Sequence, residues 1–287
     1  MTCSPPLARL DFGAMLGTFL AVVHFDGGRF VGWQRQREGR SVQGEFERVL
    51  ERLAGAAVVA HAAGRTDAGV HAVGLGVSFP LPEKWTSGAV RRALNALLPP
   101  DCWVESVARM QPGFHARKSA IARRYRYDIG TDPASASPFR RPFEWALGRA
   151  LDLPALQAAA AVVRGEHDFQ SFSVRGQDKP HWRCRVSQAD WSERAEGHGL
   201  SFHVGADRFL HHMVRMLVGT MAEVGLGRRP VADMAALLLR GDNLETSAPA
   251  PPQGLYFVSA VYPAACYLER ESDVPVAPES PVTSPPA

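Results

Sequence analysis

A short polar loop between two apolar segments limits the folds that are open to this chain. Residues 63–71 read Ala-Gly-Arg-Thr-Asp-Ala-Gly-Val-His, which gathers a cation, a carboxylate, an imidazole and two glycines. Residues 58–59 before the loop and residues 73–79 after it predict strands. Asp67 is therefore expected on a strand-to-strand loop, and loops on rigid scaffolds often carry the chemistry. The alternative is a turn in which Asp67 bonds its own backbone and Arg65 lies in solvent.

The rest of the first half predicts strands crossed by two helices. Residues 19–25 predict a strand that ends at an Asp-Gly-Gly turn, and residues 30–33 predict a returning strand after that turn. Ser41 is placed to cap a helix whose apolar side chains recur at helical spacing, and Ser87 to cap a second helix. Residues 103–110 alternate like a strand. We therefore expect an α+β layer.

The second half has a similar content of elements without a detectable sequence repeat. On its first predicted strand, a period of two places Arg123, Tyr125 and Tyr127 on one face. Cations beside aromatic rings can grip phosphates and stack bases. A half-buried strand with core tyrosines and solvated arginines explains the pattern equally well. Strands are predicted at 121–129, 182–191, 200–204 and 255–262, and helices at 152–163, 209–224 and 231–240.

Length and composition allow two subdomains. The chain has 287 residues, of which 46% are hydrophobic, so it can bury one large core or two smaller ones. We expect a flexible leader at 1–17, a first α+β subdomain at 18–112 that carries the Asp67 loop, a second α+β subdomain at 113–267 and a disordered tail at 268–287.

Charge and cysteine content narrow the class of protein. The formal net charge is only +3, so a binding site for a polyanion depends on clusters of arginines rather than on the total charge. Such clusters occur at 35–40 and 123–126. A single cluster of this kind is usually part of the solvated surface. The four cysteines are scattered and fit a reduced cytoplasm. No apolar run approaches the length of a membrane span, and we expect no signal peptide. His115, His211 and His212 lack the spaced partners of a zinc site, so we expect satisfied or substrate-facing histidines and no metal.

Six motifs follow one another along the chain in the order of a known family. Together they resemble the bacterial tRNA pseudouridine synthase A family over residues 19–262. Agreement of six blocks in order and spacing is far more specific than any single motif. The motifs are Gly-Trp-Gln-Arg-Gln at 32–36, the loop at 63–71, Phe-His-Ala-Arg at 114–117, Ala-Arg-Arg-Tyr-Arg-Tyr at 122–127, His-His-Met-Val-Arg at 211–215 and Gly-Leu-Tyr at 254–256.

The resemblance implies a pseudouridine synthase fold, in which two α/β-sandwich-like subdomains share a mixed, mainly antiparallel central sheet with helices on one side. It also implies a cytoplasmic homodimer whose basic clefts bind tRNA. The implied enzyme is an isomerase that converts uridine to pseudouridine at positions 38, 39 and 40 of the anticodon stem-loop. Neither a metal nor a small-molecule cofactor is implied.

The resemblance also assigns roles to residues by their places in the motifs. Asp67 resembles the catalytic aspartate, Tyr125 the active-site tyrosine that packs on the target base, and Arg215 the arginine that pairs with the aspartate. Arg65 resembles the residue that enters the stem as the base leaves it. The other substrate-binding positions implied are Phe114, His115, Ala116, Arg117, Lys118, Arg35, Arg123 and Leu255.

These roles fit the chemistry of the reaction. Isomerisation breaks the N1–C1′ bond, turns the uracil and rejoins it through C5, so nothing is oxidised and no cofactor is required. The reaction needs an ionised carboxylate as nucleophile or proton acceptor, and a neighbouring guanidinium favours the charged form in a closed pocket. A paired base must first be flipped out of the stem, so a wedge and an aromatic face are also needed.

Three places depart from the family pattern. Leu75-Gly76 stands where Gln and a β-branched residue are usual, which predicts a different polarity near the pocket. Only Lys84 or Trp85 is available as the basic residue usual near the start of the second helix. The loop at 173–180 aligns loosely, so its contacts with tRNA stay open.

Two other functions remain open from the sequence. One is a catalytically inactive tRNA-binding protein or RNA-folding chaperone, although binding alone does not require a carboxylate in an electropositive cleft. The other is a hydrolase with Asp67 as nucleophile. Glycosidases use a second carboxylate nearby, and the loop itself contains none.

Overall fold

The structure is a computed structural model that describes residues 15–174 and 181–268. Most of the predicted leader and tail, and residues 175–180 of the loosely aligned loop, therefore lie outside the described residues. Among the described residues, no helix combines the length and the apolar character needed to cross a membrane.

One mixed sheet runs through the whole fold. Its strand order is β4-β1-β3-β10-β5-β9-β8-β7, with β2 paired to β3 and β6 paired to β5. The pairs β3–β10 and β5–β6 are parallel, and the other pairs are antiparallel. The strands are β1 (Leu16–Phe25), β2 (His61–Ala62), β3 (His71–Pro82), β4 (Cys102–Met110), β5 (Ala122–Gly130), β6 (Trp145–Ala146), β7 (Gly165–Asp168), β8 (Arg183–Glu193), β9 (Leu200–Ala206) and β10 (Leu255–Val261).

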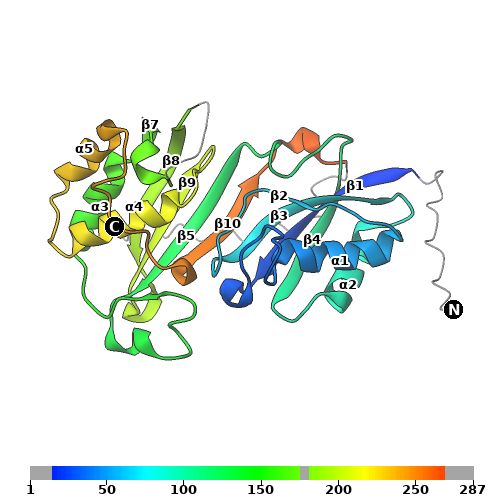
Figure 1. Cartoon of the computed structure of the whole chain (residues 1–287), viewed down its shortest axis with the longest axis horizontal. Helices are drawn as coiled ribbons and strands as arrows, with labels where there is room; N and C mark the ends of the chain where they lie inside the picture. Colours follow the sequence, from blue (N-terminus) through cyan, green and yellow to red (C-terminus); the bar gives the residue numbers. More distant parts are fainter. Residues whose placement is uncertain (1–14, 175–180, 269–287) are drawn as a thin grey trace, which may run out of the picture.

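The last strand joins the two halves of the molecule. Strand β10 pairs with β3 on one side and with β5 on the other. Figure 1 shows β5 and β10 at the centre, between a half that contains α1 and α2 and a half that contains α3, α4 and α5. The shared central sheet is therefore confirmed, whereas the subdomain boundary at residue 112 stays a prediction. The helices are α1 (Val42–Ala54), α2 (Ser87–Leu97), α3 (Leu153–Val162), α4 (Met213–Gly225) and α5 (Ala232–Arg240).

Both cores lie on the same face of the sheet. Directly paired residues on neighbouring strands point to the same face, and Ala72, Phe257 and Tyr125 are paired in this way across β3, β10 and β5. Phe257 is fully buried in the core that includes the apolar side chains of α1, and Tyr125 packs against both that core and the core of α3 and α4. The predicted α+β class with helices on one side is confirmed.

Local signals placed the first helix correctly. The Ser41 hydroxyl accepts a hydrogen bond from the Gly44 N–H at 3.2 Å, and α1 ends at Gly55 in the left-handed conformation. The second helix begins one residue earlier than predicted, because Thr86 rather than Ser87 is the capping residue: its hydroxyl accepts from the Ala89 N–H.

Three strand or helix predictions are wrong. Residues 30–33 and 58–59 are not strands, and Val59 is 56% exposed. The helix predicted from residue 209 begins only at Met213. Residues 30–33 are apolar enough for a strand, but the N–H of Trp33 bonds to the Thr66 carbonyl rather than within a regular ladder.

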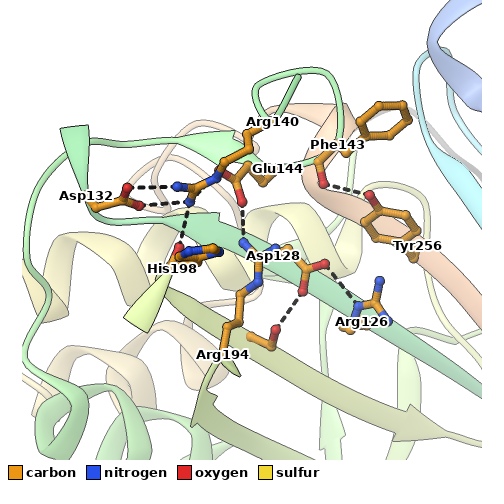
Figure 2. A network of polar contacts seen from close by, with 10 residues as sticks. Arg126, Asp128, Asp132, Arg140, Phe143, Glu144, Arg194, His198 and Tyr256 are labelled. Atoms are coloured by element: carbon orange, nitrogen blue, oxygen red, sulfur yellow. Dashed lines mark hydrogen bonds and ion pairs between the residues drawn. The ribbon is translucent and has the colours of Figure 1, made fainter. Parts of the chain in front are cut away.

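A network of ion pairs holds the loop between β5 and α3 (Figure 2). Glu144 is 1% exposed and accepts hydrogen bonds from Arg140, at 2.9 Å, and from Arg194. Arg140 also forms a bidentate pair with Asp132, at 2.7 and 2.8 Å. In the same loop, the Phe143 carbonyl accepts a hydrogen bond from the Tyr256 hydroxyl at 2.6 Å. The network thus fixes the loop between β5 and α3 to the central strands.

Replacing Glu144 with Gln is expected to lower the free energy of unfolding by about 2 kcal/mol. Loss of one partner of a buried ion pair typically costs roughly 3–5 kcal/mol, and we expect less here because Arg140 and Arg194 keep 20% and 27% of their side chains exposed. Urea unfolding measures the change. The control is Glu166→Gln, which removes the exposed pair with Arg185 and should leave the midpoint unchanged. An unchanged midpoint for Glu144→Gln would contradict the assignment.

Candidate active site

The loop that carries Asp67 rests on residues 27–33, which include the segment 30–33 that was predicted as a strand. The Trp33 N–H donates to the Thr66 carbonyl at 3.1 Å, and the Gly69 N–H donates to the Phe30 carbonyl at 3.3 Å. Gly32 has φ 103°, and a Cβ there would lie 2.6 Å from the Thr66 carbonyl oxygen. Close backbone contact, rather than a strand ladder, therefore positions the loop.

His71 fixes the far end of the same loop. It is 2% exposed, its Nδ1 accepts from the Gly27 N–H at 3.0 Å, and its Nε2 lies 3.1 Å from the Pro142 carbonyl. A carbonyl only accepts, so the proton is on Nε2 and the ring is neutral. Its ring stacks on Tyr256 at 5.0 Å. The geometry of the Asp67 loop thus depends on a buried, neutral imidazole.

The free energy of unfolding is expected to fall as the pH is lowered from 7 towards 5. Burial lowers the pKa of His71 below its ordinary 6.5, so between these two values the unfolded chain binds a proton that the folded chain does not. Burial lowers the pKa of His203 in the same way. Urea unfolding across this range measures the slope, and His71→Gln should reduce it. A slope that is unchanged in this variant would contradict the role of His71.

Asp67 is the meeting point of three segments of the chain. Arg215, in the first turn of α4, donates from Nη1 to Asp67 Oδ2 at 3.1 Å and from Nε to the Ala250 carbonyl at 2.7 Å. His211 Nε2 lies 3.5 Å from Oδ1, and His212 Nε2 lies 3.2 Å from Oδ2. The Asp67 side chain is 22% exposed. The carboxylate is thus surrounded by donors while one side stays accessible.

The two histidines meet Asp67 because α4 starts later than predicted. His212 is the N-cap residue of α4 and has φ 63° and ψ 4°, the only positive φ of a non-glycine residue among residues 15–174 and 181–268. Such a conformation costs roughly 1–3 kcal/mol and is found mainly at functional sites. Burial lowers the pKa of His212, an effect that nearby Asp67 opposes. The sequence predicted satisfied or substrate-facing histidines here, but not their contact with Asp67.

Asp67 lies at the floor of a cleft of about 1150 Å³. A smaller pocket of about 60 Å³ shares Asp67 and Tyr125 with the cleft and is also lined by Arg215 and Leu255. Among the described residues that line the two cavities, Asp67 alone carries a carboxylate. The cationic side chains that line the cleft are Arg65, Arg117, Lys118, Arg123 and Arg208.

Tyr125 forms an aromatic wall of both cavities. Its ring packs edge-to-face on Phe209, at 4.9 Å, and on Phe257, at 5.0 Å. Burial raises its pKa above the ordinary value, and the charge of Asp67 acts in the same direction, so the phenol stays protonated. A Cβ on Gly64 would lie 3.3 Å from the Tyr125 hydroxyl, which explains the glycine that precedes Arg65 in the loop.

Known proteins are similar to this chain over most of its length. The sequence model of the tRNA pseudouridine synthase family matches residues 21–117 and 159–263, more than half of the chain. The chain belongs to the tRNA pseudouridine synthase family. It is 39% identical to the tRNA pseudouridine synthase A of Myxococcus xanthus over 240 residues, which cover 84% of this chain and 90% of that protein.

Two further relatives extend over similar lengths. The tRNA pseudouridine synthase A of Methylococcus capsulatus is 37% identical over 252 residues, or 87% of this chain and 91% of that protein. The enzyme of the same name from Klebsiella pneumoniae is 39% identical over 264 residues, or 91% of this chain and 93% of that protein. The family and the isomerase class predicted from the sequence are therefore confirmed.

Several cationic residues predicted to bind substrate line the cleft of this synthase. Arg65 is exposed at the edge of the small pocket, and its guanidinium has no ion-pair partner among the described residues. Arg117 and Lys118 lie on the wall with His115, whose ring stacks on His61 at 4.4 Å. Burial lowers the pKa of His115, and His61 adds to the effect. His61 had no motif and was missed in the sequence.

Arg123 also lines the cleft, but its donors are already used. Its guanidinium donates to the carbonyls of Ala63, Ala120, Asp207 and Arg117. These four carbonyls come from three separate segments, at residues 63, 117–120 and 207. The contacts favour a positioning role for Arg123, which holds these segments together, over direct binding of phosphate.

The arginine-rich segment at 35–40 divides into two kinds of residue. Arg35 keeps 71% of its side chain exposed and has a 3.5 Å contact with Glu47, while its neighbours Gln34 and Gln36 line the cleft. Arg40 pairs with Asp101 and Glu45 and lies over the ring of Phe30. Arg40 is therefore structural, and binding of RNA by Arg35 stays a prediction.

The other predicted positions pack the walls of the site. Leu255 lines the small pocket, whereas Phe114 packs on Tyr262 in a separate apolar cluster. Ala116 is fully buried there, and its N–H donates to the Ser78 hydroxyl. Leu75 is fully buried in the core of α1, so the polarity change predicted near the pocket from this residue is wrong.

Three side chains of the site also have the donor types of a metal centre. Asp67, His211 and His212 offer one ligand atom each, all within 4.8 Å of one another. Arg215 already contacts Asp67 Oδ2, so a metal ion there would lie against a guanidinium. We therefore interpret the cluster as hydrogen bonding and charge pairing, and the absence of a metal stays a prediction.

Proposed function

We propose that this protein isomerises uridine to pseudouridine at positions 38, 39 and 40 of the anticodon stem-loop of tRNA, with Asp67 as the catalytic carboxylate. One observation carries the proposal: among the described residues that line this basic cleft, Asp67 has the one carboxylate, and it contacts Arg215 and lies beside Tyr125. A cleft built for binding alone gains nothing from a negative charge at the point where a polyanion enters.

The cleft has the features that a flipped base requires. Cations along the walls attract the phosphate backbone. Arg65 is free to enter the stem in place of the target base, and Tyr125 offers an aromatic face beside Asp67. Asp67 then starts the cleavage of the N1–C1′ bond, and Arg215 holds the carboxylate in place. The uracil turns and rejoins through C5, so the product has the atoms of the substrate.

Mapping of pseudouridine in unmodified tRNA treated with the purified protein tests this function. Carbodiimide modification followed by primer extension should give new stops at positions 38 to 40. Binding of the tRNA without any new stop would contradict the proposal and favour a tRNA-binding protein.

We also propose that the protein acts as a homodimer in the cytoplasm, as the family resemblance implies. Sedimentation equilibrium of the purified protein should give twice the mass of 31.2 kDa. A single species at the monomer mass, at concentrations at which the enzyme is active, would contradict the dimer.

Replacing Arg65 with Ala is expected to lower the rate of isomerisation about 100-fold, the size of effect that follows loss of correct positioning. The affinity for tRNA should fall only modestly, because the substitution removes one of several cations that line the cleft and can contact phosphate. Single-turnover assays and filter binding measure the two effects. Arg52→Ala, at the exposed end of α1, is the matched control.

A mismatched substrate separates the wedge role of Arg65 from a general loss of charge. A uridine that is already unpaired costs less to flip, so the mismatch should restore part of the rate of Arg65→Ala. An equal defect on paired and unpaired uridine would contradict the wedge role.

A further inference from the structure

We propose that His212 is a further catalytic residue, whose imidazole accepts the proton that leaves C5 of the uracil after the C1′–C5 bond has formed. The inference rests on the proposed function. It deepens that function by naming the base for the step that completes the reaction, a step for which the positions of Asp67 and Tyr125 provide no obvious acceptor.

The proton balance of the reaction calls for such a base. When C1′ joins C5, that carbon still carries its hydrogen, and the C5–H bond must break with its electron pair returning to the ring. N1, released from the ribose, gains one proton. Loss at C5 and gain at N1 balance, so no oxidant or co-reactant is involved. A group that takes up one proton and releases it again is sufficient.

Few side chains of the small pocket can accept a proton. Arg65 and Arg215 are cations without an available lone pair, and the hydroxyl of Thr66 is a very weak base. Tyr125 stays a protonated phenol because burial raises its pKa. Asp67 Oδ2 is already engaged by Arg215, at 3.1 Å, and by His212, at 3.2 Å. His211 and His212 are the remaining bases among the described residues that line the pocket.

The contacts of His212 fix which nitrogen is the acceptor. Its Nε2 lies 3.2 Å from Asp67 Oδ2, and an ionised carboxylate only accepts hydrogen bonds, so Nε2 carries the proton and Nδ1 the lone pair. Burial lowers the pKa of His212, which keeps the ring neutral before the step. The charged groups that face it are Asp67, His211 and Arg215. Asp67 stabilises the imidazolium that forms.

The backbone distinguishes His212 from its neighbour. The side chain of His212 is 26% exposed, against 43% for His211. His212 also adopts the left-handed conformation at the start of α4, and this conformation keeps its ring against Asp67. A histidine that merely capped the helix would bond a backbone N–H, but the side chain of His212 makes no such bond.

A C5 isotope effect tests the proposal. Unmodified tRNA is transcribed with uridine that carries hydrogen or deuterium at C5, and pseudouridine formation is followed under single-turnover conditions. The variants are His212→Gly and His212→Asn, since both residues accept φ 63° without strain and neither has a ring base. We expect a rate about 100-fold below that of the unaltered protein, and a further decrease on deuteration because C5–H cleavage now limits the rate.

Added imidazole provides a second readout, since the space left in His212→Gly can admit the free base. It should raise the rate of His212→Gly and abolish its dependence on deuterium. A rate equal to that of the unaltered protein, a slow variant without a deuterium effect, or a slow variant that imidazole does not restore would each overturn the proposal. If the unaltered protein itself makes no pseudouridine, the proposed function fails instead, so the two failures are distinguishable.

Discussion

Asp67→Asn is expected to abolish pseudouridine formation, with a loss of roughly 10⁴-fold or more, as is usual when the principal reactive group of an active site is removed. Asn has the same size and can still accept a hydrogen bond from Arg215, which now lies 3.1 Å from Oδ2. The variant should therefore fold normally. It lacks the negative charge that attacks carbon or takes a proton, so the N1–C1′ bond stays intact.

The affinity of Asp67→Asn for tRNA should be equal to or slightly higher than that of the unaltered protein. Among the described residues that line the cleft, this substitution removes the one carboxylate, and repulsion of phosphate decreases. Pseudouridine mapping and filter binding on the same tRNA measure both quantities.

Asp152→Asn is the matched control, because Asp152 caps α3 through the Ala155 N–H and Asn caps equally well. The control should retain full activity. Turnover by Asp67→Asn at more than a trace would exclude Asp67 as the reacting carboxylate, and loss of binding in that variant would show that the change had disturbed the cleft.

The sequence predicted the fold and the central pair of the site because these depend on local or motif-level signals. The apolar stripe and the Ser41 cap of α1 are local, and they appear in the structure as predicted. Asp67 and Arg215 are 148 positions apart, so their contact followed only from the family motifs. Spacing within either motif contains no information about that distance.

Other parts of the site depend on contacts that no local pattern records. The apolar period through 209–224 continues across His212, so it predicted one helix, whereas a left-handed residue breaks that helix and turns two histidines to Asp67. In the same way, the sequence pattern around Arg40 is typical of an RNA-binding cation, but in the fold Arg40 pairs with Asp101 of another segment. Charge alone cannot separate an arginine that binds RNA from one that is already paired.

Arg215→Lys is expected to lower kcat about 100-fold with little change in KM, although it keeps the positive charge. Arg215 joins two segments at once, because Nη1 donates to Asp67 and Nε donates to the Ala250 carbonyl at 2.7 Å. A lysine ammonium is a single point on a flexible stem and cannot hold both acceptors in one plane. Asp67 then loses its fixed orientation, and misplacement of a reactive group by about 1 Å costs on the order of 10² in rate.

Single-turnover kinetics of Arg215→Lys and of the exposed control Arg228→Lys measure this effect, and the control should be unchanged because Arg228 pairs only with Glu223 among the described residues. The double variant with Asp67→Asn adds a stricter test. If Arg215 acts through the carboxylate, Arg215→Lys should lower the rate strongly only while Asp67 is present, so the two substitutions are not additive. A full rate for Arg215→Lys would mean that charge alone is sufficient, and that the bridge to Ala250 has no part in placing Asp67 for the reaction.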